Sequence, residues 1–295
     1  MDRAADRLQR HEIGHGLAFR EALSRSPSGE RLFAFTGGRR PATANPLPVP
    51  AACGTLSAVN EQQIRERALE VREAIARAAA RSGRSPSDVT VLPITKGHPV
   101  AVVRGVAAAG FGAVGENRVA EVEAKQAELG KAGLRWHMVG HLQRNKAGRA
   151  VRVFDVVESV DSVRLGQRLQ LEAERGGGNP IPVLVQVNAG AEDQKSGVEP
   201  AEVVDVLGEL LDHRLLGVEG LMTMAPFTSD ERVLRRTFQV ARECLERCRA
   251  ELSGFEGRTL SMGMSNDFEI AVEEGSTEVR LGTVLLGQRP EGRWT

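Results

Sequence analysis

The 295-residue sequence contains no tyrosine, and aromatic residues make up only 4% of it. Tyrosine is a common acid or base in enzymes, because its hydroxyl group can both donate and accept a proton. Any mechanism that needs such a tyrosine is therefore excluded for this chain, unless a partner protein supplies the residue.

Cysteine is also scarce, with three residues at positions 53, 244 and 248. Three cysteines do not make a disulfide framework, so a reduced protein is expected. Cys244 and Cys248 lie one turn apart on a predicted helix, where a thiol pair or half of a metal site is the alternative to core packing. We favour packing, and the sequence predicts no metal site.

The chain carries no excess charge, because lysine plus arginine and aspartate plus glutamate each number 39. This balance argues against a general role in binding nucleic acid or a membrane surface. No apolar run is long enough for a transmembrane helix, and the charged first residues do not resemble a secretory signal. We therefore expect a cytoplasmic protein with neither nucleic acid nor membrane as a partner.

The first 56 residues differ from the rest, with little periodicity and a proline cluster at 41–50. They contain an H-E-x-x-H motif at 11–15, which on a helix could place two imidazoles around zinc. Only ten residues precede this motif, and Ala18 and Glu21 stand where the longer protease motif has glycine and histidine. We therefore expect residues 1–56 to form a flexible extension rather than a metalloprotease.

From residue 57 to about 290, strand-like and helical patterns alternate. Strands are expected at 89–95, 111–114, 135–139, 156–159, 183–187, 217–222, 259–262 and 278–281. Helices are expected at 60–81, 100–109, 117–129, 141–151, 162–175, 200–213, 230–252 and 266–274. Eight such units predict a single α/β domain, a (β/α)8 TIM barrel over 57–290, with a short tail at 291–295. An open doubly wound sheet is the alternative, although no G-x-G-x-x-G follows the first strand.

Two small-residue turns near the C-terminus predict a phosphate site. Ser265 and Asn266 can cap the helix that follows the seventh strand, and Asn266 with Glu269 has capping-box spacing. Gly282 and Thr283 form a second turn directly after the eighth strand. In this class of barrel, the loops after strands seven and eight often hold a phosphate, while two ordinary turns are the alternative.

Lys96 and Arg280 indicate which phosphate-bearing ligand the predicted site would bind. Lys96 directly follows the first apolar strand, where burial can depress the pKa of its amine and leave it free to attack an aldehyde. Arg280 ends the eighth strand, and its permanent charge could donate to a pyridine nitrogen. An amine that binds aldehydes, opposite a phosphate site, suggests pyridoxal 5'-phosphate. A surface lysine and a salt-bridged arginine are the alternative interpretations.

The same residues resemble a known family. Over about residues 58–290 the chain is similar to the pyridoxal phosphate homeostasis proteins, also called YggS-like proteins, which share the barrel of the alanine racemase N-terminal domain. The shared motifs are ITK at 94–96, GEN at 115–117, WHMVGHLQRNK at 136–146, KSG at 195–197, GLMTM at 220–224, SMGMS at 261–265 and VRLGT at 279–283. The chain departs from the family at Thr95, often serine, and at Gly97 and His98, which replace bulkier or basic residues.

The resemblance implies roles for individual residues. It implies a Schiff base between Lys96 and the cofactor, and a contact of Arg280 with the pyridine nitrogen. It implies phosphate contacts from Ser265 and from the turn at Gly282 and Thr283. Two further cofactor contacts are carried over from the family motifs, Asn117 and Met224.

Two classes of function compete for this chain. One is a homeostatic protein that binds, buffers or delivers pyridoxal phosphate, acting as a monomer with apo-enzymes as candidate recipients. The other is an amino-acid racemase, whose relatives take a second base from a tyrosine in a further domain. The missing tyrosine and the end of the chain at Thr295 favour the first class. We expect no strong turnover, with weak side activity left open.

Overall fold

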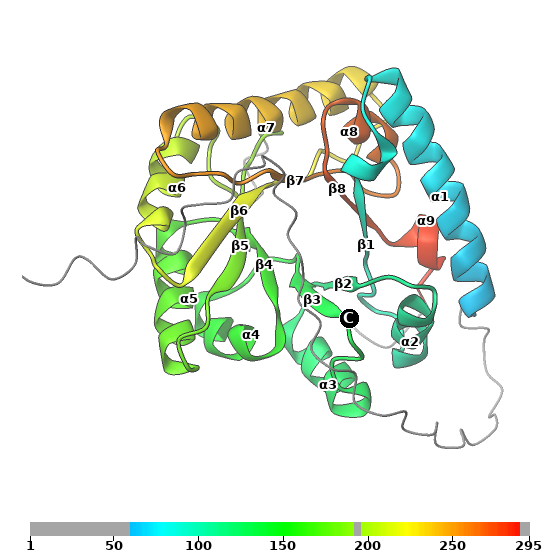
Figure 1. Ribbon diagram of the computed structural model, residues 1–295, viewed down its shortest axis with the longest axis horizontal. Coiled ribbons are helices and arrows are strands. Elements are labelled where there is room, and N and C mark those ends of the chain that lie inside the picture. Colours follow the sequence, from blue (N-terminus) through cyan, green and yellow to red (C-terminus); the bar gives the residue numbers. More distant parts are fainter. Residues whose placement is uncertain (1–59, 192–195, 290–295) are drawn as a thin grey trace, which may run out of the picture. The chain divides into compact units, whose positions relative to one another are not determined.

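The computed structural model describes residues 60–191 and 196–289, which contain every predicted strand and helix (Figure 1). The extension at 1–56, its H-E-x-x-H motif and the tail at 291–295 lie outside the described residues, as does Lys195 of the KSG motif. Within the described part, no helix is long and apolar enough to cross a bilayer.

Eight parallel strands form a nearly closed barrel, which confirms the predicted TIM barrel over the open sheet. The hydrogen-bonded order is β1-β8-β7-β6-β5-β4-β3-β2, and a bridge between Ile94 and Gly115 joins the two ends of this order. The strands are β1 (Thr90–Pro93), β2 (Ala113–Glu116), β3 (Arg135–Met138), β4 (Val156–Val160), β5 (Ile181–Gln186), β6 (Leu216–Met222), β7 (Thr259–Ser261) and β8 (Glu278–Leu281).

The helices surround the strands (Figure 1). They are α1 (Glu61–Arg81), α2 (Val100–Ala108), α3 (Val119–Leu129), α4 (Ala147–Val153), α5 (Val163–Arg175), α6 (Val203–Leu211), α7 (Glu231–Glu251), α8 (Phe268–Glu273) and α9 (Thr283–Leu286). Two differences from the sequence prediction matter. The helix expected at 141–151 begins only at Ala147, after a 3-10 turn, and the turn at 282–283 opens into the short helix α9.

Helix α1 begins with a capping box formed by Asn60 and Gln63. The Asn60 side chain accepts a hydrogen bond from the backbone of Gln63, and the Gln63 side chain accepts one in return from the backbone of Asn60. The apolar residues of α1 recur on one face and are buried against the barrel, and the helix packs beside α2, α8 and α9. At its end, Arg81 forms an ion pair with Glu273 of α8 at 2.5 Å.

The apolar core lies mainly between the strands and the helices, where Cys244 and Cys248 of α7 are also buried. Burial raises the pKa of both thiols, which fits the expected packing role. A small second apolar cluster of Leu92, Ile94 and Val139 lies apart from this core. Polar side chains are buried on the strands themselves, and they define the sites described below.

Candidate functional site

Lys96 lies at the carboxyl end of β1, on a short turn that follows the fully buried Thr95. Its side chain is partly buried, and its amine makes no hydrogen bond or ion pair within the part of the chain that the structure describes. Burial lowers the pKa of Lys96, and the positive charges of Arg289 and Arg280 lower it further, against the opposing effect of nearby carboxylates. The environment therefore favours the neutral, nucleophilic amine predicted from the sequence.

A buried ion cluster fixes the backbone on which Lys96 stands. Lys125 of α3 donates to the Thr95 carbonyl oxygen at 2.8 Å, to Glu116 Oε1 at 2.6 Å and to Glu121 Oε1 at 2.7 Å. The Thr95 hydroxyl also donates to Glu116 Oε1 at 2.6 Å. Burial raises the pKa of Glu116 to about 7, although Lys125 opposes this shift. The cluster, defined as Lys125, Glu116 and Glu121, thus holds the residue before the site lysine at both its carbonyl oxygen and its hydroxyl group.

The residue after Lys96 is fixed by the same cluster. The Gly97 backbone N–H donates to Glu121 Oε1 at 2.7 Å. Gly97 has a φ of 73°, in the left-handed region where glycine is favoured, and a Cβ there would lie 2.9 Å from the Arg289 side chain. Glycine at this departure from the family pattern is therefore a local requirement of the turn.

Arg280 lies inside the barrel on β8, close enough to Lys96 for its charge to affect the lysine pKa. Strands β1 and β8 are paired, with Leu92 opposite Arg280. Lys96, which follows β1, and Arg280 therefore come from neighbouring strands of the barrel. The guanidinium group donates to Ser261 Oγ at 2.7 Å and to the Thr223 carbonyl oxygen at 2.6 Å. Burial lowers the pKa of Arg280, but arginine starts so high that it keeps its proton.

Behind Arg280 lies a buried hydrogen-bond chain that the sequence did not predict. Ser261 Oγ donates to Glu158 Oε2 at 2.8 Å, and Glu158 Oε1 lies 2.7 Å from His137 Nδ1. Burial alone would raise the pKa of Glu158, but His137 and Arg280 hold it below its usual range. His137 itself lies within β3 and is buried. One signal was present, since Glu158 is the only charged residue of the otherwise neutral β4.

Ser265 and the Gly282–Thr283 turn come together in space, as predicted for a phosphate site. Ser265 Oγ accepts a hydrogen bond from the Val284 backbone N–H at 3.3 Å, which places it beside the first turn of α9. The predicted capping of α8 is wrong. Its N-cap residue is Asp267, which makes no side-chain capping bond to α8 and accepts instead from the Met264 N–H at 2.5 Å.

Asn117 and Met224 also lie at the carboxyl ends of their strands, directly after β2 and two residues after β6. Both are partly buried. The loop after β3 approaches Asn117 closely, because a Cβ on Gly140 would lie 2.7 Å from the Asn117 carbonyl oxygen. Every cofactor residue predicted from the sequence thus belongs to one end of the barrel.

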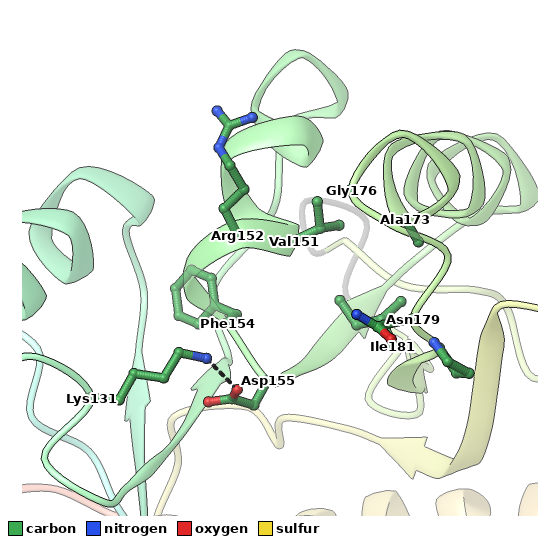
Figure 2. A pocket seen from close by; sticks show the side chains of 10 residues that line it. Lys131, Val151, Arg152, Phe154, Asp155, Ala173, Gly176, Asn179 and Ile181 are labelled. Carbon is green, nitrogen blue, oxygen red and sulfur yellow. Dashed lines mark hydrogen bonds and ion pairs between the residues drawn. The ribbon is translucent and has the colours of Figure 1, made fainter.

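A cavity elsewhere in the barrel is lined by none of these residues. Figure 2 shows a cavity of about 550 Å³ between α4, α5 and the start of β5, where Lys131 pairs with Asp155 at 2.5 Å. Its other lining residues are mostly apolar or exposed at helix ends. The lysine of this cavity is already paired with Asp155, and none of the cofactor residues predicted from the sequence lines it.

The chain matches one family model and several known proteins. Residues 69–290 match the family model of the alanine racemase N-terminal domain. The chain is 38% identical over 229 residues to the pyridoxal phosphate homeostasis protein of Pseudomonas aeruginosa, covering 78% of this chain and 97% of that one. It is 35% identical to PipY of Synechococcus elongatus, solved with pyridoxal phosphate bound, with a TM-score of 0.67 and coverage of 76% and 100%.

Alanine racemase itself is a more distant likeness. The enzyme of Clostridium difficile is 17% identical, with a TM-score of 0.62, so the comparison shows a shared fold only. The match covers 79% of this chain but 57% of the racemase chain. The homeostasis proteins, by contrast, match over almost their whole length.

Proposed function

Because this chain belongs to the pyridoxal phosphate homeostasis proteins, a family built on the alanine racemase N-terminal domain, we propose that its barrel binds pyridoxal 5'-phosphate and helps to control the free cofactor level. The observation that carries the proposal is the amine of Lys96, which is partly buried, has a lowered pKa and lies near the buried Arg280. Binding, buffering and delivery to apo-enzymes are the activities that such a site supports.

The residues present fit this cofactor. Pyridoxal phosphate supplies an aldehyde that condenses with a primary amine, an aromatic nitrogen that accepts a hydrogen bond, and a phosphate dianion. The barrel offers an amine at Lys96, a donor at Arg280 and a hydroxyl at Ser265 beside the N-terminus of α9. These three groups come from the carboxyl ends of β1, β8 and β7, which is where barrels of this class bind ligands.

Lys96 acts as the nucleophile in this proposal. Only a neutral amine attacks an aldehyde, so the lowered pKa increases the reactive fraction near neutral pH. The ion cluster below it has a different task. Lys125 and Glu121 hold the backbone of Thr95 and Gly97, so the lysine side chain starts from a fixed position.

Ser265, Gly282 and Thr283 hold the phosphate in this proposal. Backbone N–H groups at the start of a helix carry partial positive charge, and the Ser265 hydroxyl adds a donor beside them. Gly282 suits a position next to an anion, since a Cβ there would only reach ordinary contact distances of 3.7–3.8 Å from Ile94. The protein itself therefore leaves room for a side chain at Gly282, and we assign that room to the ligand.

Arg280 donates to the pyridine nitrogen in this proposal, and Asn117 and Met224 line the same end of the barrel. A protonated guanidinium keeps the ring nitrogen unprotonated, which makes the ring a weak electron sink. The chain also has no tyrosine to serve as a second base. We therefore propose a protein of the cytoplasm without strong turnover, for which racemisation of amino acids is the outcome that would contradict the assignment.

The test is an absorbance spectrum of purified protein with pyridoxal phosphate, before and after borohydride reduction, followed by peptide mapping. The reduced cofactor should map to Lys96, and Lys96→Ala should lose the adduct while its thermal unfolding changes little. Lys146→Ala is the matched control, because Lys146 lines a neighbouring surface cavity with Asn117. An adduct on Lys146 or Lys195 would place the site elsewhere.

A further inference from the structure

A second polar site lies at the other end of the barrel, away from Lys96. His137 of β3, Glu158 of β4 and Glu278 of β8 are all buried, and one ligand atom from each lies within 4.8 Å of the other two. They line a cavity of about 370 Å³ whose other walls are mostly the first residues of the strands. We call these three residues the floor cluster.

One atom of the floor cluster points to a missing ligand. Glu278 Oε1 is buried and has no hydrogen-bond partner among the residues that the structure describes, although Glu278 as a whole is only 9% exposed. A buried carboxylate oxygen without a partner is costly, and such an atom in a native protein calls for a water or an ion. Both oxygens of Glu158, by contrast, are hydrogen-bonded, to His137 and Ser261.

The charges of the floor cluster select a cation. Glu158 and Glu278 together carry two negative charges when ionised, and Arg280 is the buried arginine whose charge acts on both. A divalent cation would take the place of the proton that joins His137 and Glu158 and would lie against the unpartnered oxygen of Glu278. The hydrogen bond between His137 Nδ1 and Glu158, at 2.7 Å, occupies a place where a metal ion can bridge the same two atoms.

The ligand types narrow the choice of cation. One imidazole and two carboxylates form a three-residue set that suits zinc and related first-row metals, whereas magnesium and calcium prefer oxygen ligands alone. Ligand atoms on opposite sides of such an ion lie about 4 Å apart, because each bond is about 2.1 Å long. Ligand atoms that lie within 4.8 Å of one another can therefore meet at one ion after small side-chain movements.

We propose that His137, Glu158 and Glu278 bind one divalent transition-metal ion of the zinc type, with water from the cavity completing its coordination. The ion joins the neighbouring strands β3 and β4 to β8, which is distant from both along the sequence. Its role is structural, because it neutralises the buried carboxylates and ties the barrel together at the amino-terminal ends of the strands. No local spacing rule predicts this site, since its ligands are 21 and 120 residues apart in sequence.

The test uses the full chain, stripped with a chelator and dialysed against micromolar Zn²⁺, with the bound metal measured by mass spectrometry. We expect one ion per chain, at least tenfold weaker binding for Glu278→Gln, and a rise in melting temperature with Zn²⁺ for wild type that Glu278→Gln does not show. Glu219→Gln is the matched control, because Glu219 lines the same cavity but is not a proposed ligand. It should bind Zn²⁺ as wild type does.

One other candidate zinc-binding feature, the H-E-x-x-H motif, needs to be separated from the floor cluster. The double variant His11→Ala, His15→Ala removes the H-E-x-x-H motif and should retain the ion. A second cluster variant, Glu278→Met, replaces the carboxylate with an apolar chain of similar length and should also lose it. Equal Zn²⁺ binding by wild type and both Glu278 variants would overturn the proposal, as would loss of the ion in the His11, His15 variant alone.

Discussion

Replacing Lys125 by methionine tests how strongly the buried ion cluster supports the site lysine. Lys125 is 2% exposed, and its ammonium group contacts Glu116 and Glu121, which are almost fully buried as well. Lys125→Met leaves both carboxylates without their cation and removes the donor to the Thr95 carbonyl oxygen. Breaking a buried pair in this way costs about 3–5 kcal/mol, because the remaining charge is uncompensated.

The assay is urea unfolding at neutral pH, followed by circular dichroism. Lys131→Met is the matched control, because Lys131 is half-exposed and its pair with Asp155 should be worth about 0–1 kcal/mol. Adding Glu116→Gln and Glu121→Gln to Lys125→Met removes both stranded charges, and the triple variant should recover more than half of the lost stability.

Cofactor binding should respond to the same change. Because Lys125 holds the residue before Lys96, Lys125→Met should also weaken retention of pyridoxal phosphate, even where the protein remains folded. If Lys125→Met costs no more than Lys131→Met, or if the triple variant is no more stable than the single one, the ion cluster does not act as described.

The remaining predictions concern pH, phosphate capture and the extension. Burial raises the pKa of Glu116 from 4.5 to about 7, so its protonation stabilises the fold fully below pH 4.5, and this contribution is lost as pH rises through 7. Relative to Glu116→Gln, wild type should therefore lose on the order of 3 kcal/mol between pH 5 and 8 in urea unfolding; a difference that is constant with pH would contradict this. Ser265→Ala removes one hydrogen bond to a charged group, about 1.5–3 kcal/mol, so it should bind pyridoxal phosphate about ten- to hundredfold more weakly and leave pyridoxal binding unchanged in equilibrium titrations. Equal losses for both ligands would mean that Ser265 shapes the barrel instead. Deleting residues 1–56 should leave cofactor affinity and melting temperature nearly unchanged, whereas a large drop in either would show that the extension belongs to the working domain.

The barrel was predictable because its signals are local. Strand β8 has the predicted bounds, and helix α1 lies within the range expected at 60–81, since the periodicity of apolar residues depends on neighbours in sequence. The strand expected at 111–114 lies instead at Ala113–Glu116. The strand ends at Glu116, a buried acidic residue, whereas a pattern of apolar residues alone places an acidic residue outside a strand. Glu116 can be buried there because it pairs with Lys125 of α3.

The residues of the candidate site could be predicted where short motifs mark them. They could not be predicted where a side chain bonds to a residue far away in the sequence. Lys96, Arg280 and the two small-residue turns are found from their positions at strand ends. Glu158 was missed because its partner Ser261 is 103 residues away in sequence. The capping of α8 was wrong for a similar reason, since the Ser265 hydroxyl is used by the backbone of Val284, from the next unit of the barrel.

The pairing of the first strand with the last has a consequence for synthesis of the protein. Strand β1 pairs with β8 along its whole length, with Thr90 opposite Glu278. Its link to β2 is the bridge from Ile94, the residue after β1, to Gly115. A ribosome synthesises Lys96 184 residues before Arg280, the arginine of the same candidate site. The proposed site is therefore complete only after the final strand has emerged, so a truncated translation product that lacks β8 should retain the cofactor poorly.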